Sequence, residues 1–173
     1  PGMLKEFGVT FCLVGHSERR IHLQETDEMV ALKAAALQKA GIQPIICVGE
    51  SQAQRKKGET LKVVRAQVTA ALAKLKPESS VKPAFAYEPL WAIGSGKACL
   101  PQEAHDVHAT IREVLVKKFG KAAEDMPILY GGSVDTRNVA EYLSTTHING
   151  VLVGSASLDP RSFGLLCRSA IVS

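Results

Sequence analysis

Short, uninterrupted apolar runs recur along the 173-residue chain, and polar residues and glycines come directly after each run. Continuous apolar runs, unlike alternating ones, are typical of strands that are buried on both faces of a parallel sheet. We predict five such strands, at residues 9–14, 43–48, 83–87, 127–130 and 150–153. With helical patterns between them, this order restricts the fold to an α/β class with a parallel sheet and right-handed crossovers.

The stretches between these runs have the spacing of amphipathic helices. In residues 59–76 apolar side chains recur at steps of three and four, which is typical of a helix with one buried face. The members of this stripe are Leu61, Val64, Val68, Leu72 and Leu75. A similar stripe in residues 104–115 predicts a helix that Pro101 can begin, and Asp159 with Pro160 predicts the start of the last helix.

Composition narrows the class of protein. With 46% hydrophobic and 22% charged residues, the chain is typical of one globular domain, residues 1–173. No apolar run approaches the roughly 18 residues of a membrane helix. The net charge of +4 is mild and the basic residues are scattered, which argues against nucleic-acid binding. The four cysteines lack metal-ligand spacing, so we predict no metal site and a reducing, cytoplasmic location.

Polar residues and glycines gather directly after the predicted strands. His16 and Glu18 follow the first strand, and Glu88 follows the third. Glycine-rich turns at residues 131–133 and 154–155 follow the fourth and fifth. The carboxyl ends of parallel strands are where active sites form in α/β folds, so we expect these groups to lie close together.

His16 and Glu88 are candidates for an acid–base pair, because they place an imidazole and a carboxylate at neighbouring strand ends. Taken singly, a histidine beside a turn is more often structural than catalytic. A glutamate at the end of a buried strand is the stronger indication, since burying a carboxylate is costly without a purpose.

The turns at residues 131–133 and 154–155 can aim backbone N–H groups at one point, where a phosphate is the natural ligand. The alternative is that each is a tight strand-to-helix turn without a ligand. Residues 94–97 do not form a phosphate-binding loop of the Walker A type, because Trp91 occupies the position of its first glycine.

Five motifs in order make the whole chain resemble the triosephosphate isomerase family. They lie at residues 15–20 (GHSERR), 47–50 (CVGE), 86–97 (AYEPLWAIGSGK), 130–133 (YGGS) and 152–158 (LVGSASL). The resemblance implies a TIM (β/α)8-barrel fold, which takes about 250 residues when complete. The chain corresponds to an N-terminally truncated barrel of about five βα units.

The resemblance implies the interconversion of dihydroxyacetone phosphate and glyceraldehyde 3-phosphate through an enediolate, without cofactor or metal. It makes Glu88 the base that moves the proton and His16 the neutral electrophile, with Glu18 as a third catalytic residue. It further implies that the substrate phosphate binds to Gly94, Ser133, Gly154 and Ser155.

The resemblance also implies a closing lid that shuts water out of the site. The lid residues are Pro89, Leu90, Trp91, Ala92, Ile93, Gly94, Ser95, Gly96 and Lys97. We expect Trp91 and Ile93 to supply its apolar cover. Ser155 replaces the second glycine of the family's last phosphate turn, and we expect this to be tolerated only if its φ is negative or mildly strained.

The family's first three strands have no counterpart in these residues, and neither do the asparagine and lysine at the end of its first strand or its long dimer loop. Glu18 therefore lacks the lysine with which it pairs in the family. We interpret the chain as an enzyme cut in frame, which binds a phosphorylated triose and forms a homo-oligomer with an altered interface.

A second hypothesis is a catalytically impaired barrel fragment that binds phosphate and associates with itself through two open sheet edges. A third hypothesis, another phosphate-binding barrel enzyme, does not explain the motifs around His16 and Glu88 together.

Overall fold

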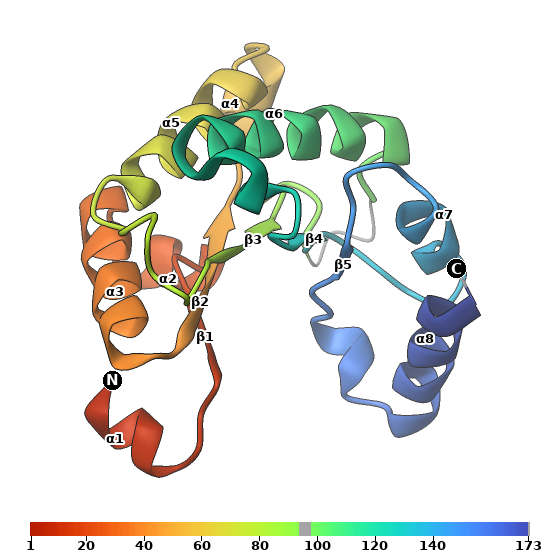
Figure 1. Ribbon diagram of the computed structural model, residues 1–173. Coiled ribbons are helices and arrows are strands. Elements are labelled where there is room, and N and C mark those ends of the chain that lie inside the picture. The colour runs from red at the N-terminus through yellow and green to blue at the C-terminus, as the bar shows by residue number, and fades with distance from the viewer. Residues whose placement is uncertain (94–97, 173) are drawn as a thin grey trace.

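The structure is a computed structural model that describes residues 1–93 and 98–172. It contains one sheet of five parallel strands whose spatial order follows the sequence, β1-β2-β3-β4-β5 (Figure 1). The strands are β1 (Phe11–Val14), β2 (Gln43–Val48), β3 (Ala84–Tyr87), β4 (Ile128–Tyr130) and β5 (Gly150–Val151). The predicted number, order and direction of the strands are confirmed, although all except β2 are shorter than predicted.

Helices connect the strands, as predicted. The α-helices are α1 (Gly2–Glu6), α2 (Ser17–His22), α3 (Asp27–Ala40), α4 (Gln52–Lys56), α5 (Thr60–Leu72), α6 (Pro101–Phe119), α7 (Val139–Leu143) and α8 (Pro160–Val172). Two short 3-10 helices, η1 (Gly120–Ala123) and η2 (Ser155–Ser157), follow α6 and β5. The predicted helix 59–76 ends four residues early, and Leu61 of its stripe is 44% exposed rather than buried.

The strands form an arc, and α3, α5 and α6 cover its outer side (Figure 1). Register places Val14, Ile46, Phe85 and Ile128 side by side on β1 to β4. None of these four side chains is more than 4% exposed, and all belong to the main apolar core. The core between sheet and helices therefore fixes the strand ends relative to one another.

The opposite face of β1 is open. Phe11 is 57% exposed and Leu13 is 44% exposed, so the prediction that every strand is buried on both faces is wrong for β1. The physical reason is that β1 is an edge strand, paired only with β2 in the described part of the chain. The predicted pair of sheet edges, at β1 and β5, is confirmed.

We predict that a protein consisting of residues 1–173 alone associates through the open face of β1. Phe11→Lys should weaken association about tenfold or more, because burying a large apolar side chain contributes about 1.5–3 kcal/mol. Leu158→Lys is the control, since Leu158 is 84% exposed and lies outside the sheet. Sedimentation at several concentrations measures both variants, and a monomeric parent chain at tens of micromolar would contradict the prediction.

Candidate active site

A cavity of about 460 Å³ opens at the carboxyl ends of the strands. It brings together the predicted catalytic residues and those predicted phosphate-binding residues that the structure describes: His16, Glu18, Glu88, Ser133, Gly154 and Ser155. Of the predicted lid, Ile93 lines the cavity. The remaining predicted phosphate residue, Gly94, lies outside the described residues, as do Ser95, Gly96 and Lys97.

Backbone hydrogen bonds hold Glu88 between two neighbouring strands. Its N–H donates to the Val48 carbonyl of β2 at 2.7 Å, and the Tyr87 carbonyl accepts from the Gly131 N–H at 2.8 Å. Glu88 is only 2% exposed. The carboxylate is therefore placed by the sheet itself rather than by a loop.

Two glycines make room for this glutamate. A Cβ atom added at Gly49 would overlap the Glu88 carbonyl oxygen, and one added at Gly131 would lie 3.0 Å from the Glu88 Cγ atom. Glycine is the one residue type whose backbone can approach another backbone this closely at position 49. The glycines that follow β2 and β4 thus have a packing role beside Glu88.

Both carboxylate oxygens of Glu88 have partners from the turn after β1. Oε2 accepts from the Ser17 N–H at 2.9 Å, and Oε1 lies 3.0 Å from Nε2 of His16. Burial raises the pKa of the Glu88 carboxyl above its ordinary value, and the opposing effects of His16, the Ser17 N–H and Arg20 do not cancel this rise. A raised pKa makes the ionised carboxylate a stronger base.

His16 caps the N-terminus of α2, and its Nδ1 atom accepts from the Glu18 N–H at 3.4 Å. Because Nδ1 is an acceptor, the proton of a neutral imidazole lies on Nε2, which faces Glu88. The Glu18 carboxylate borders the cavity and forms no ion pair within residues 1–93 and 98–172.

The turn that carries His16 is held by a buried glutamate that sequence reasoning missed. Glu25 accepts from the Gly15 N–H at 3.1 Å, from Arg19 at 2.5 Å and from Lys33 at 3.0 Å. Burial alone would raise the pKa of Glu25, but the hydrogen bonds from Lys33, Arg19 and Gly15 lower it below its ordinary value. Glu25 therefore acts as an ionised anchor for the end of β1.

A second carboxylate, Glu50, belongs to the motif at residues 47–50 but was given no role from the sequence, and it anchors the near end of the predicted lid. It is fully buried and accepts from Trp91 Nε1 at 2.8 Å and from the Tyr87 hydroxyl at 3.1 Å. The guanidinium of Arg55 covers the Trp91 ring at 4.0 Å. The indole N–H of Trp91 is thus held by a buried carboxylate, and Trp91 is not among the described residues that line the cavity. The sequence signal for Glu50 is its position directly after β2, next to Gly49.

The predicted phosphate turns present free backbone donors. In the described part of the chain, the N–H groups of Ser133, Gly154 and Ser155 have no acceptor. Among the described residues other than glycine, only Gln24 and His147 have positive φ. Ser155 therefore stands in the glycine position without left-handed strain.

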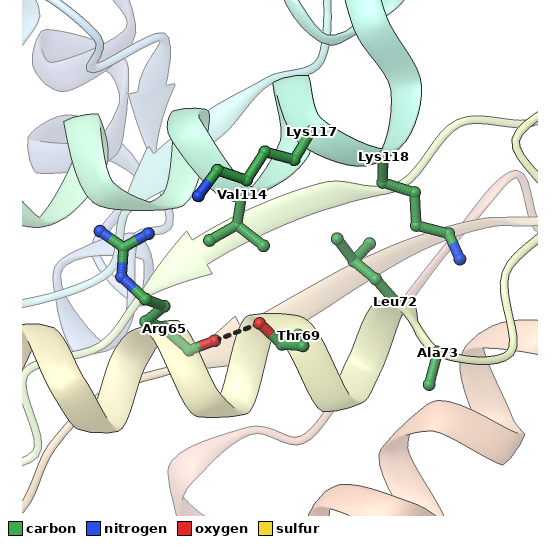
Figure 2. Close-up of a pocket in the computed structure, with 7 residues that line it drawn as sticks. All are labelled: Arg65, Thr69, Leu72, Ala73, Val114, Lys117 and Lys118. Carbon is green, nitrogen blue, oxygen red and sulfur yellow. Dashed lines mark hydrogen bonds between the residues drawn. The ribbon is translucent and has the colours of Figure 1, made fainter.

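A second cavity of about 480 Å³ lies in the groove between α5 and α6 (Figure 2). Arg65, Lys117 and Lys118 surround a floor that includes Leu72 and Val114. Figure 2 shows the basic side chains of Arg65, Lys117 and Lys118 around this groove. The described residues that line it include no carboxylate and no imidazole, unlike those of the cavity at the strand ends.

The described residues contain neither a metal-binding cluster nor a membrane-spanning helix. Within residues 1–93 and 98–172, no three His, Cys, Asp or Glu side chains lie where they could hold a metal ion. None of the described helices combines the length and the apolar character that crossing a membrane requires.

Comparison with known proteins identifies the family. A model of the triosephosphate isomerase family matches residues 1–170. The chain belongs to the triosephosphate isomerase family. It is 51% identical over 167 residues to the triosephosphate isomerase of Idiomarina loihiensis, which covers 96% of this chain and 66% of that protein. It is 45% identical over 170 residues to the enzyme of Pseudomonas entomophila, covering 98% of this chain and 68% of that protein.

The chain thus spans about two thirds of the length of these relatives, at 66% of the Idiomarina protein. The matched part is consistent with the described sheet, because five parallel βα units are a portion of the eight-stranded barrel of the triosephosphate isomerase family. The fold class predicted from the sequence is confirmed.

We predict that Gly49→Ala destabilises the protein by about 3 kcal/mol or more, as overpacking against a backbone forces the strands apart. Gly164→Ala is the matched control, because no atom lies within 4 Å of its added Cβ and it sits inside α8. That control should gain up to about 1 kcal/mol from helix propensity. Urea unfolding measures both variants, and equal stabilities would show that Gly49 has no packing role.

Proposed function

We propose that the chain carries the proton-transfer and phosphate-binding part of a triosephosphate isomerase. In this proposal the substrate is a phosphorylated triose, and dihydroxyacetone phosphate is converted to glyceraldehyde 3-phosphate through an enediolate. The observation that carries the proposal is the contact of the buried Glu88 carboxylate with His16 Nε2 and the Ser17 N–H. The names of the relatives give additional support.

Each residue of this pair has a role that follows from its environment. Glu88 takes a proton from the substrate carbon next to the carbonyl, and later returns it to the neighbouring carbon. Its burial helps because a desolvated carboxylate is more basic than one in water. His16 donates its Nε2 proton to the substrate carbonyl oxygen, which replaces Glu88 Oε1 as the acceptor. Negative charge that develops on that oxygen is thereby stabilised.

The phosphate group is bound by the backbone N–H groups of Ser133, Gly154 and Ser155. Oriented backbone donors suit an anion, and the lining residues that the structure describes include no lysine or arginine. Gly94 is proposed as a fourth donor on the strength of the family pattern. Ile93 and the other lid residues exclude water from the enediolate.

Efficient turnover is proposed to require two further polar side chains that residues 1–173 do not supply. The asparagine and lysine that the family carries after its first strand match no position of this sequence. Removing a single preorganised donor typically lowers the rate about 10²–10³-fold. A protein of residues 1–173 alone is therefore proposed to be a poor isomerase, at least ~10³-fold below a full-length relative.

The open face of β1 supports the further proposal that these residues form a homo-oligomer. Phe11 and Leu13 present a contiguous apolar surface on an edge strand, which favours association. A cytoplasmic location is also proposed, and the four free cysteine thiols are compatible with a reducing compartment.

We predict that Glu88→Gln abolishes isomerase activity, since an amide cannot accept the proton. Glu88→Asp retracts the carboxylate by one methylene and should lower kcat about 10²-fold with a smaller change in KM. Glu141→Gln, at an exposed acid of α7, is the control and should retain parent activity. A coupled assay of triose phosphate isomerisation measures all three, and unchanged turnover in the Gln variant would remove Glu88 from the mechanism.

We predict that inorganic phosphate shifts the amide resonances of Ser133, Gly154 and Ser155 in a titration followed by NMR. The reason is that these donors have no acceptor within the described structure. Arg65→Ala is the control, because the basic groove between α5 and α6 is the competing anion site. Shifts confined to residues around Arg65, Lys117 and Lys118 would refute the proposed phosphate site.

A further inference from the structure

Tyr142 of α7 is buried against Tyr130, the last residue of β4. The two rings stack with centroids 4.0 Å apart and planes inclined by 17°. Tyr142 is 1% exposed and Tyr130 is fully buried. A phenol that is this deeply buried requires a partner for its hydroxyl group.

The hydroxyl groups of both tyrosines bind the backbone of Cys99. The Cys99 N–H donates to the Tyr130 oxygen at 3.2 Å, and the Tyr142 hydroxyl donates to the Cys99 carbonyl. The two hydroxyl oxygens lie 3.3 Å apart. Each phenol can donate only one hydrogen bond, and Tyr142 donates its bond to the Cys99 carbonyl. The bond between the two hydroxyl groups is therefore donated by Tyr130 and accepted by the Tyr142 oxygen. The three residues therefore form a closed ring of hydrogen bonds.

This ring connects two segments that border the candidate site. A Cβ atom added at Gly132 would overlap the Tyr130 hydroxyl, so the turn that carries Ser133 rests directly on the Tyr130 side chain. The same ring of hydrogen bonds also holds Cys99. The residue before it, Ala98, lines a pocket together with Ser133 and Ser155. A shift of Tyr130 would thus move both the turn after β4 and the chain that leads into α6.

We propose that Tyr142 is a positioning residue for the phosphate-binding side of the cavity, acting through Tyr130 and Cys99. It touches no proposed substrate atom itself. Its ring fixes the plane of Tyr130, and its hydroxyl completes the pairing of both Cys99 backbone groups. The inference rests on the proposed function, because it assigns a role in binding the phosphate.

Tyr142→Phe is the sharpest test, since it keeps the stacked ring and removes only the hydroxyl. The change leaves the Cys99 carbonyl without its donor and the Tyr130 hydroxyl without its acceptor. We expect the Cys99 amide to exchange with solvent faster, and the dissociation constant for inorganic phosphate to rise about fivefold or more, as unsatisfied buried groups loosen the segment. Ser144→Ala removes a hydroxyl that donates to the exposed Glu141 carbonyl at the end of the same helix and is the control.

Phosphate affinity is measured well below the melting temperature, because a purely structural role of Tyr142 would lower stability and leave the affinity of the folded protein unchanged. Faster Cys99 exchange together with weaker phosphate binding, with neither change in Ser144→Ala, supports the inference. Parent-like affinity or parent-like Cys99 exchange in Tyr142→Phe overturns the inference and leaves the proposed function standing. A parent chain that shows no phosphate shifts at Ser133 and Gly154 overturns both.

Discussion

The burial of one carboxylate, Glu88, is the constraint around which the strand ends are arranged. Its backbone bridges β2 and β4, and its side chain reaches the turn after β1. A charge in this position is tolerated because both of its oxygens have hydrogen-bond partners, from Ser17 and His16. Gly49 and Gly131 leave the space that the glutamate requires. Packing, hydrogen bonding and chemistry therefore depend on the same few atoms.

Further buried groups hold the surroundings of this carboxylate rigid. Glu25 fixes the turn with His16, Glu50 holds Trp91, and the pair of Tyr130 and Tyr142 holds Cys99. Through these contacts Trp91 and Cys99 are both attached to the body of the sheet. In contrast, one apolar face of β1 is exposed to solvent. The residues around Glu88 are therefore well packed, whereas the sheet that carries them is not fully covered.

The sequence was sufficient for the strand order and for the pairing of His16 with Glu88, because apolar runs mark buried strands and parallel strands bring their carboxyl ends together. It was insufficient for Glu25 and Glu50, whose roles depend on donors that only the fold brings near. The role of Tyr142 could not be predicted for the same reason, since its partner Cys99 is 43 positions away in the chain. The apolar run around Phe11 predicts burial on both faces, whereas the open sheet edge that leaves Phe11 exposed was expected only from the missing family strands.

The pKa of the Glu88 carboxyl in the folded protein, measured by ¹³C NMR, tests the central claim most directly. We expect a value above that of an ordinary glutamate, because burial outweighs the effects of His16, the Ser17 N–H and Arg20. The folded protein then binds this proton more tightly than the unfolded chain. Ionisation of Glu88 therefore costs stability as pH rises from the unfolded pKa through the folded pKa. A value at or below that of an ordinary glutamate would contradict the account, because it would show that His16, the Ser17 N–H and Arg20 together outweigh burial, as the partners of Glu25 do.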